Sequence, residues 1–148
     1  MKKLLSKYLE IYALVTAIAC GVILIRKENM SKSRKWAALL LFISCIHAWD
    51  ESKWSGGYFD LLLGKLGLKG KLPDDLAYTA LTDSALAASV IPCIIDKAPF
   101  KYLSAGMGFF ECVTHTAGIK LYDVDTVPGI YTAWLWAALA AISLVKNK

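Results

Sequence analysis

Two histidines and the acids beside them are the residues of this chain best suited to chemistry. In the stretch ISCIHAWDESKW, His47 is followed by Asp50 and Glu51. The second histidine, His115, has Glu111 four residues before it. On a helix, residues three and four apart lie on one face, so each histidine is expected to share a face with a carboxylate. Imidazole and carboxylate groups together are ligands for iron, zinc or manganese, and we therefore predict a divalent transition-metal site.

The apolar stretches around these residues predict helices of membrane-spanning length. The chain has 148 residues, of which 57% are hydrophobic and 20% charged, which is more apolar than an ordinary soluble domain. A hydrocarbon core about 30 Å thick requires roughly 20 helical residues. Five segments approach that length: Tyr8–Ile25, Trp36–Trp49, Leu76–Ile95, Tyr102–Tyr122 and Pro128–Val145. We therefore expect an all-α fold, with residues 1–148 forming one membrane-embedded bundle of five transmembrane helices in the bacterial cytoplasmic membrane.

Within such a bundle, the polar groups of all five helices are expected to lie near one level. Counted from the starts of their predicted helices, His47 and His115 differ in depth by only about 3 Å. The third helix brings Asp83 near the same level, and we include it among the metal ligands. Asp83 can also bond back to its own helix. Glu10 in the first helix and Thr132 in the fifth complete the polar layer, although Glu10 can equally lie at the membrane interface.

The segment after the second predicted helix carries a short amphipathic pattern. Phe59, Leu62, Leu63 and Leu66 follow the i, i+3, i+4 and i+7 spacing of one helix face. The pattern predicts a helix in the membrane interface, either a lid or side wall over the site or a packing element. The neighbouring Tyr58 is interpreted as an interfacial anchor rather than a stacking group.

The distribution of charge indicates which partners to expect. The net charge is +5, and basic residues gather at predicted helix ends, as in RKENMSKSRK, where they can meet lipid headgroups. We therefore expect membrane lipid as a partner and no nucleic acid.

The four cysteines form no CxxC pair, which favours buried thiols. The basic and apolar start of the chain up to Cys20 also fits a secretory or lipoprotein signal, although Glu10 interrupts it.

The stretch HAWDESKWSGGYFD resembles the signature of the HXXEE-motif membrane proteins. In that family a histidine and paired acids precede an aromatic residue and a Gly-Gly-aromatic turn; here Asp50 replaces the first glutamate, which shortens that ligand arm. His115 and the later VPGIYTAW are similar to the family's second histidine and Pro-Gly-x-x-Thr element. The resemblance covers most of the chain. It implies an integral membrane protein that binds metal through His47, Asp50, Glu51 and His115, and it implies no particular reaction.

From these observations we predict a metal-dependent enzyme. The expected metal ligands are His47, Asp50, Glu51, His115 and Asp83. Glu111 is expected to act as a further ligand or as the general base. Activated water gives hydrolysis of a small amphiphilic or lipid-like substrate, whereas redox-active iron gives its oxidation.

Two other functions stay open from the sequence. One is a metal-free isomerase that uses His47 and Glu111 as an acid/base pair. The other is a transporter or binding protein whose carboxylates carry a proton or cation. The sequence also leaves a homo-oligomer open.

Overall fold

The computed structural model describes residues 15–22, 30–53, 57–68 and 89–146, and all regular structure within these ranges is helical. The helices with defined bounds are α2 (Lys32–Lys53), α3 (Gly57–Lys65), the short 3₁₀ helix η1 (Phe100–Tyr102), α5 (Leu103–Tyr122) and α6 (Ile130–Lys146). Residues 15–22 and 89–94 are also helical.

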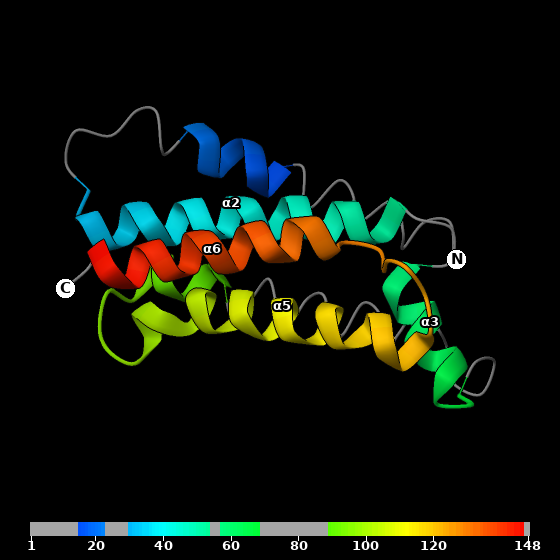
Figure 1. Cartoon of the computed structure of the whole chain (residues 1–148). Helices are drawn as coiled ribbons and strands as arrows, with labels where there is room; N and C mark the ends of the chain where they lie inside the picture. Colours follow the sequence, from blue (N-terminus) through cyan, green and yellow to red (C-terminus); the bar gives the residue numbers. More distant parts are fainter. Residues whose placement is uncertain (1–14, 23–29, 54–56, 69–88, 147–148) are drawn as a thin grey trace.

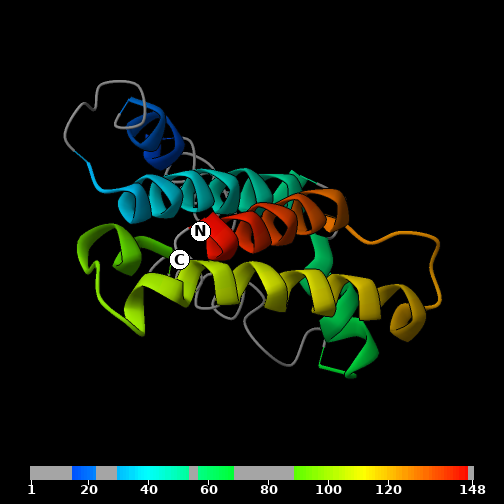
Figure 2. The same cartoon turned by 60° about the vertical axis from the view of Figure 1, so that its left-hand side comes forward.

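Three long helices, α2, α5 and α6, run side by side and form the body of the fold (Figure 1). Helix α6 packs against both α2 and α5, while α3 crosses the end at which α2 and α5 finish (Figures 1 and 2). The buried positions of α6 recur every three or four residues, as expected for a helix with one face in a core. These positions are Ile130, Ala133, Trp136, Ala137, Ala140 and Ser143. The central core therefore lies along α6.

Gly108 allows α5 and α6 to approach each other closely. A Cβ atom at this position would lie only 2.7 Å from Cδ1 of Trp136, so the indole ring occupies the place of a side chain. Trp136 is 1% exposed and packs with Leu40 and Ile43 of α2. The same indole thus contacts all three long helices and fixes their spacing.

A short connection joins α5 to α6; it is largely exposed from Asp123 to Thr126 and buried from Val127 to Gly129. Helix α5 ends at Tyr122 and is capped by Asp123, which has φ +56° and whose N–H donates to the carbonyl of Ile119. The turn then reaches Gly129 with φ +79°, a conformation that glycine adopts without steric cost. The carbonyl of Gly129 accepts the N–H of Ala133 and begins α6. Because the turn is short, α5 and α6 are antiparallel neighbours, and the start of α6 faces the end of α2.

The predicted bundle of five transmembrane helices is wrong for the helices seen here. Among the described residues, none of the helices combines the length and apolar character that a membrane crossing requires. In α2 the uncharged run Trp36–Trp49 has 14 residues, or about 21 Å, which is short of a core about 30 Å thick. Helix α6 has 17 residues. The predicted multi-pass membrane location depends on these spans and is corrected with them.

The other predicted spans fail or cannot be followed for different reasons. Helix α5 has 20 residues but includes Glu111 and Lys120, which lower its apolar character. Most of Tyr8–Ile25 and Leu76–Ile95 lies outside the described residues.

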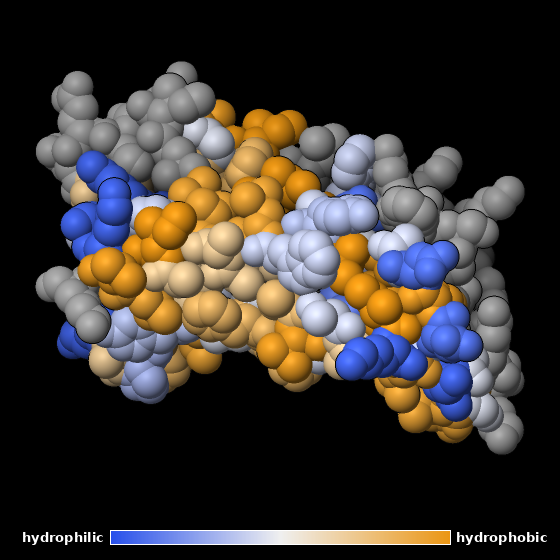
Figure 3. Space-filling view, viewed as in Figure 1, coloured by the Kyte–Doolittle hydropathy of each residue, from blue (hydrophilic) through white to orange (hydrophobic). Residues whose placement is uncertain are grey.

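The apolar content that predicted the spans is divided between the core and the outer surface. On the face shown in Figure 3, hydrophobic side chains cover the middle and hydrophilic ones gather towards the two ends. Val113 of α5 and Tyr131 and Val145 of α6 are among the exposed apolar residues. A high apolar content therefore accompanies helices that each bury only part of their circumference.

The four cysteines are free thiols. Cys20 and Cys45 are buried in one cluster with Leu41, and Cys93 packs against it. Burial raises the pKa of Cys45 to about 12 and that of Cys93 to about 11, so both remain protonated at neutral pH. Cys20 and Cys45 are therefore the buried thiols that the sequence predicts, whereas Cys93 and Cys112 are only partly buried.

Candidate metal site

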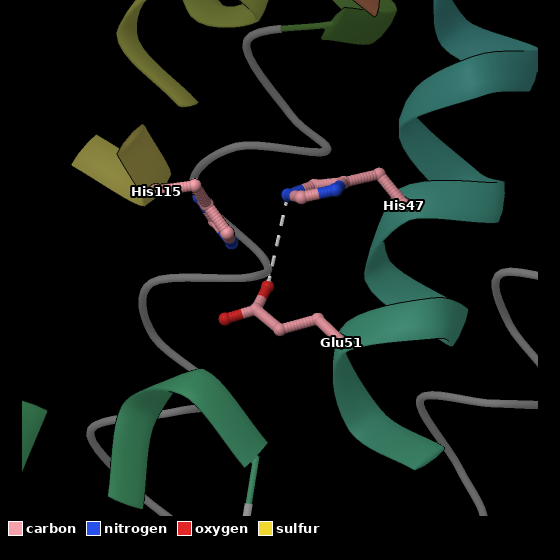
Figure 4. A group of neighbouring side chains, drawn as sticks. All are labelled: His47, Glu51 and His115. Atoms are coloured by element: carbon pink, nitrogen blue, oxygen red, sulfur yellow. Dashed lines mark ion pairs between the residues drawn. The ribbon is translucent and has the colours of Figure 1, made fainter. Parts of the chain in front are cut away.

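The two histidines meet at the interface of α2, α5 and the start of α6. His47 and Glu51 lie one turn apart on α2, and His115 reaches them from α5 (Figure 4). Each of the three residues offers a ligand atom, and these atoms all lie within 4.8 Å of one another. His47 is 3% exposed and His115 is completely buried. Glu51 and His115 are 64 positions apart in the sequence (115 − 51), yet they lie in the same cluster in the structure.

His115 presents an unprotonated Nε2 atom to the cluster. Its Nδ1 atom lies 2.9 Å from the backbone carbonyl oxygen of Glu111. A carbonyl oxygen can only accept, so Nδ1 carries the proton and the lone pair of the neutral ring is on Nε2. This Nε2 atom is buried and has no hydrogen-bond partner. A bound cation would satisfy such a lone pair.

His47 is arranged in the same way by a different partner. Its Nδ1 atom lies 2.9 Å from Oγ1 of Thr132, and its Nε2 atom is buried without a hydrogen-bond partner. The two imidazole rings are 4.9 Å apart between centroids and meet edge to face. Both Nε2 atoms are therefore available on the inner side of the cluster.

Two carboxylates lie beside the imidazoles. Oε2 of Glu51 is 3.9 Å from Nε2 of His47, and Oε2 of Glu111 is 3.7 Å from the same nitrogen. Metal–ligand bonds of roughly 2.0–2.2 Å in tetrahedral geometry place two ligand atoms about 3.4 Å apart. Since the three ligand atoms lie within 4.8 Å of one another, a closure of up to about 1.4 Å would place one ion among them.

Gly129 borders the space beside both rings. A Cβ atom on this glycine would lie 3.0 Å from Cε1 of His47 and 3.2 Å from Nε2 of His115. Any larger residue would therefore press on the two imidazole rings that supply ligand atoms. The positive φ of Gly129 also disfavours other residues, so both geometry and space select glycine here.

Helix α3 forms a side wall of the site. The ring of Tyr58 stacks on His115 with centroids 4.1 Å apart and planes inclined by 16°. Its hydroxyl donates to the carbonyl oxygen of Thr114 across 2.8 Å. Of the predicted apolar face, Leu63 is 2% exposed and anchors the helix, whereas Leu66 is 59% exposed, so the amphipathic pattern holds only in part. Tyr58 thus stacks on a histidine of the site instead of serving as the predicted interfacial anchor, and no local sequence pattern indicates this contact.

The buried charges shift the pKa values within the cluster. Burial raises the pKa of Glu51 to about 7, with the nearby acids adding to the shift and His47 opposing it. Burial lowers the pKa of His115 to about 4, and the neighbouring His47 lowers it further. Burial also acts to lower the pKa of His47, but Glu111, Glu51 and Asp50 outweigh it, so the net shift is upward. At neutral pH His115 is therefore a neutral imidazole, which is the form that binds metals.

The structure separates the six residues predicted for the site. His47, Glu51 and His115 form the cluster, and Glu111 lies at its edge. Asp50 lies behind His47, where its Oδ2 atom is 3.0 Å from Oγ1 of Thr132, and it is not part of the ligand cluster. The position of Asp83, like that of Glu10, lies outside the described residues.

Comparison of the chain with known protein families, curated proteins and solved structures finds no match. The resemblance to the HXXEE-motif proteins therefore stays a prediction from the sequence. The candidate metal site depends on the geometry of His47, Glu51 and His115 alone.

Proposed function

We propose that His47, Glu51 and His115 bind one zinc ion and that the chain is a metal-dependent hydrolytic enzyme. The observation that carries this proposal is the pair of buried Nε2 atoms, one on each histidine, which have no hydrogen-bond partner and lie beside a carboxylate. Two histidines and one glutamate are a ligand set that catalytic zinc sites use, with a further position open for water. Iron and manganese are also compatible with nitrogen and carboxylate ligands, so metal analysis is part of the test.

Glu111 is the residue we assign as general base. A bound divalent ion supplies Lewis acidity and lowers the pKa of water. The Glu111 carboxylate lies at the edge of the cluster, 3.7 Å from Nε2 of His47, and its side chain is 13% exposed. Its position allows it to accept a proton from water entering the site and to return that proton to a leaving group. The lipid-like class of substrate stays a prediction.

A metal-free acid/base function is the second candidate. The distance of 3.7 Å between His47 Nε2 and Glu111 Oε2 supports it. A proton can pass between a histidine and a carboxylate at about 2.6–3.2 Å, so only a small approach of the two side chains is needed. This candidate leaves the buried Nε2 atom of His115 without a role. It predicts an activity that a chelator does not reduce, which separates it from the first proposal.

Metal analysis of the purified protein tests the proposal. We expect about one zinc ion per chain, and hydrolysis of activated esters that a chelator abolishes and added zinc restores. Glu111→Gln is expected to keep the metal and to lose roughly 100- to 10,000-fold in turnover, because it retains the shape of the side chain but accepts no proton. The control is Ser143→Ala, which removes a buried hydroxyl that bonds only to Ala140 of its own helix. Metal-free protein that shows no thermal stabilisation by zinc would contradict the proposal.

The affinity for zinc is expected to fall as the pH is lowered below about 7. Because the pKa of Glu51 is raised to about 7 and that of His47 is also raised, these ligands hold protons in acid that zinc must displace. Each displaced proton makes the affinity fall about tenfold per pH unit. His115, with a pKa of about 4, adds no proton above about pH 5. Isothermal titration in buffers of different ionisation enthalpy counts the protons released; an affinity that is constant between about pH 5.5 and 8 would rule out these ligands.

A further inference from the structure

Thr132 connects the candidate metal site to Asp50. This threonine lies in the first turn of α6, and its Oγ1 atom has three polar neighbours. It lies 2.9 Å from Nδ1 of His47, 3.0 Å from Oδ2 of Asp50 and 2.9 Å from the carbonyl oxygen of Gly129. The hydroxyl thus stands between a candidate ligand from α2 and two oxygen atoms.

The number of hydrogen atoms decides the direction of these bonds. A threonine hydroxyl has one proton to donate and lone pairs that accept. The carboxylate of Asp50 and the carbonyl of Gly129 only accept, so the single hydroxyl proton is directed to one of them or shared between the two. The remaining contact requires Nδ1 of His47 to donate its proton to Oγ1. The lone pair of the neutral ring is then on Nε2, which is the atom that faces Glu51.

We propose that Thr132, with Asp50 behind it, is a positioning residue that holds His47 as its Nδ1–H tautomer and aims Nε2 into the metal site. Outer partners of this kind fix the orientation of a ligating histidine and make it more basic. This role rests on the proposed function for its effect on metal binding, but the tautomer itself exists without metal. The proposal also gives Asp50 a role: it acts through Thr132 instead of binding the ion.

The two histidines differ in how their tautomers are set. The Nδ1–H of His115 donates to a backbone carbonyl, which a substitution at Glu111 leaves in place. The Nδ1–H of His47 depends on a side chain, which a substitution can remove. Variants of Thr132 can therefore change one ligand while the other serves as an internal reference.

Cobalt(II) binding followed by visible absorbance provides the first test. Thr132→Val keeps the shape of the side chain but removes Oγ1, and we expect it to lower the cobalt affinity roughly 10- to 100-fold. Thr132→Ser keeps Oγ1 and is expected to stay within about threefold of the parent. The matched control is Thr116→Val, because Thr116 also links α5 to α6, through the indole N–H of Trp134, but lies outside the site. Equal losses in the Val and Ser variants would assign the effect to packing and overturn the proposal.

Nuclear magnetic resonance of the metal-free protein provides a second, independent test. With ¹⁵N-labelled histidine, the parent and Thr132→Ser are expected to show a slowly exchanging Nδ1–H proton on His47. In Thr132→Val this signal is expected to be lost, while that of His115 is unchanged. Thr132→Ala is measured alongside, so that the result does not depend on how valine packs against Asp50.

The two tests separate the two proposals. A parent protein that binds no cobalt but shows the Thr132-dependent signal refutes the metal site and keeps the positioning role of Thr132. A signal from His47 that is identical in all the variants overturns that role, whatever the metal affinity.

Discussion

Replacing His115 by asparagine is expected to lower the affinity for zinc roughly 100- to 1000-fold. Structural zinc sites bind with about 10–16 kcal/mol, or about 2.5–4 kcal/mol for each of four ligands, and each 1.4 kcal/mol corresponds to a factor of ten. The amide N–H of asparagine can take the place of Nδ1–H and keep the bond to the carbonyl of Glu111, while Nε2 is removed. The substitution thus removes the ligand atom and retains the neighbouring hydrogen bond. Competition with a chromophoric chelator measures the change in affinity.

The controls for this experiment separate ligand loss from unfolding. His47→Asn is expected to show a similar loss, because its Nε2 atom is the other nitrogen of the cluster. Ser143→Ala changes a buried polar residue eleven positions beyond Thr132, about 16 Å along α6, and is expected to bind zinc as the parent does. Zinc should raise the melting temperature of the parent and of Ser143→Ala, but not of the histidine variants. Stoichiometric zinc that remains bound in both histidine variants would show that the ion lies elsewhere.

The local pattern of the sequence predicted the main pairs of the site. The spacing of His47 and Glu51, and of Glu111 and His115, is four residues in each case, and both pairs share a face of one helix in the structure. This inference is strong because helix geometry alone determines it. That the pairs of α2 and α5 would meet was inferred from a common depth in a membrane. They meet instead because α6 packs against both helices and α3 closes the end.

Contacts between distant segments were the part that local patterns could not predict. Asp50 lies three residues after His47, and its spacing predicts that it binds the same ion. In the structure its carboxylate instead accepts a hydrogen bond from Thr132, which lies 82 positions away in the sequence. The stacking of Tyr58 on His115 joins positions 57 residues apart (115 − 58). Both contacts depend on where α3 and α6 pack, which the period of a single helix does not determine.

The all-helical fold class was predicted correctly and the membrane spans were not, for a physical reason. Apolar runs predict helices well, because the period and length of the runs reflect the backbone geometry. They predicted membrane spans poorly here for two reasons. Charged residues interrupt two of the runs, since Lys35 and Asp50 bound the uncharged part of α2 and Glu111 lies within α5. The uncharged run of α6 belongs to a helix of only 17 residues. A count of apolar residues does not take account of where the charges interrupt a helix.

Gly129→Ala is expected to lower both the stability of the fold and the affinity of the site for zinc. The residue has φ +79°, and an L-amino acid in the left-handed region costs about 1–2 kcal/mol. The added Cβ would also lie 3.0 Å from His47 and 3.2 Å from His115, so both rings must shift, which adds about 1–3 kcal/mol of overpacking. The free energy of unfolding in urea is therefore expected to fall by about 2–5 kcal/mol. Zinc affinity is expected to fall at least tenfold, because the ligand atoms no longer hold their orientation.

Gly67→Ala is the matched control, because Gly67 also has a positive φ, +66°, but has no atom within 4 Å of the position of the added Cβ. It should show the conformational cost alone, about 1–2 kcal/mol, and leave zinc affinity unchanged. The difference between the two variants then measures the crowding of the imidazoles by one methyl group. If Gly129→Ala and Gly67→Ala lose the same stability and both bind zinc as the parent does, the space beside the two histidines is not needed for the ion. The site would then have to be sought on the solvent side of Glu51 and Glu111, whose side chains are 16% and 13% exposed.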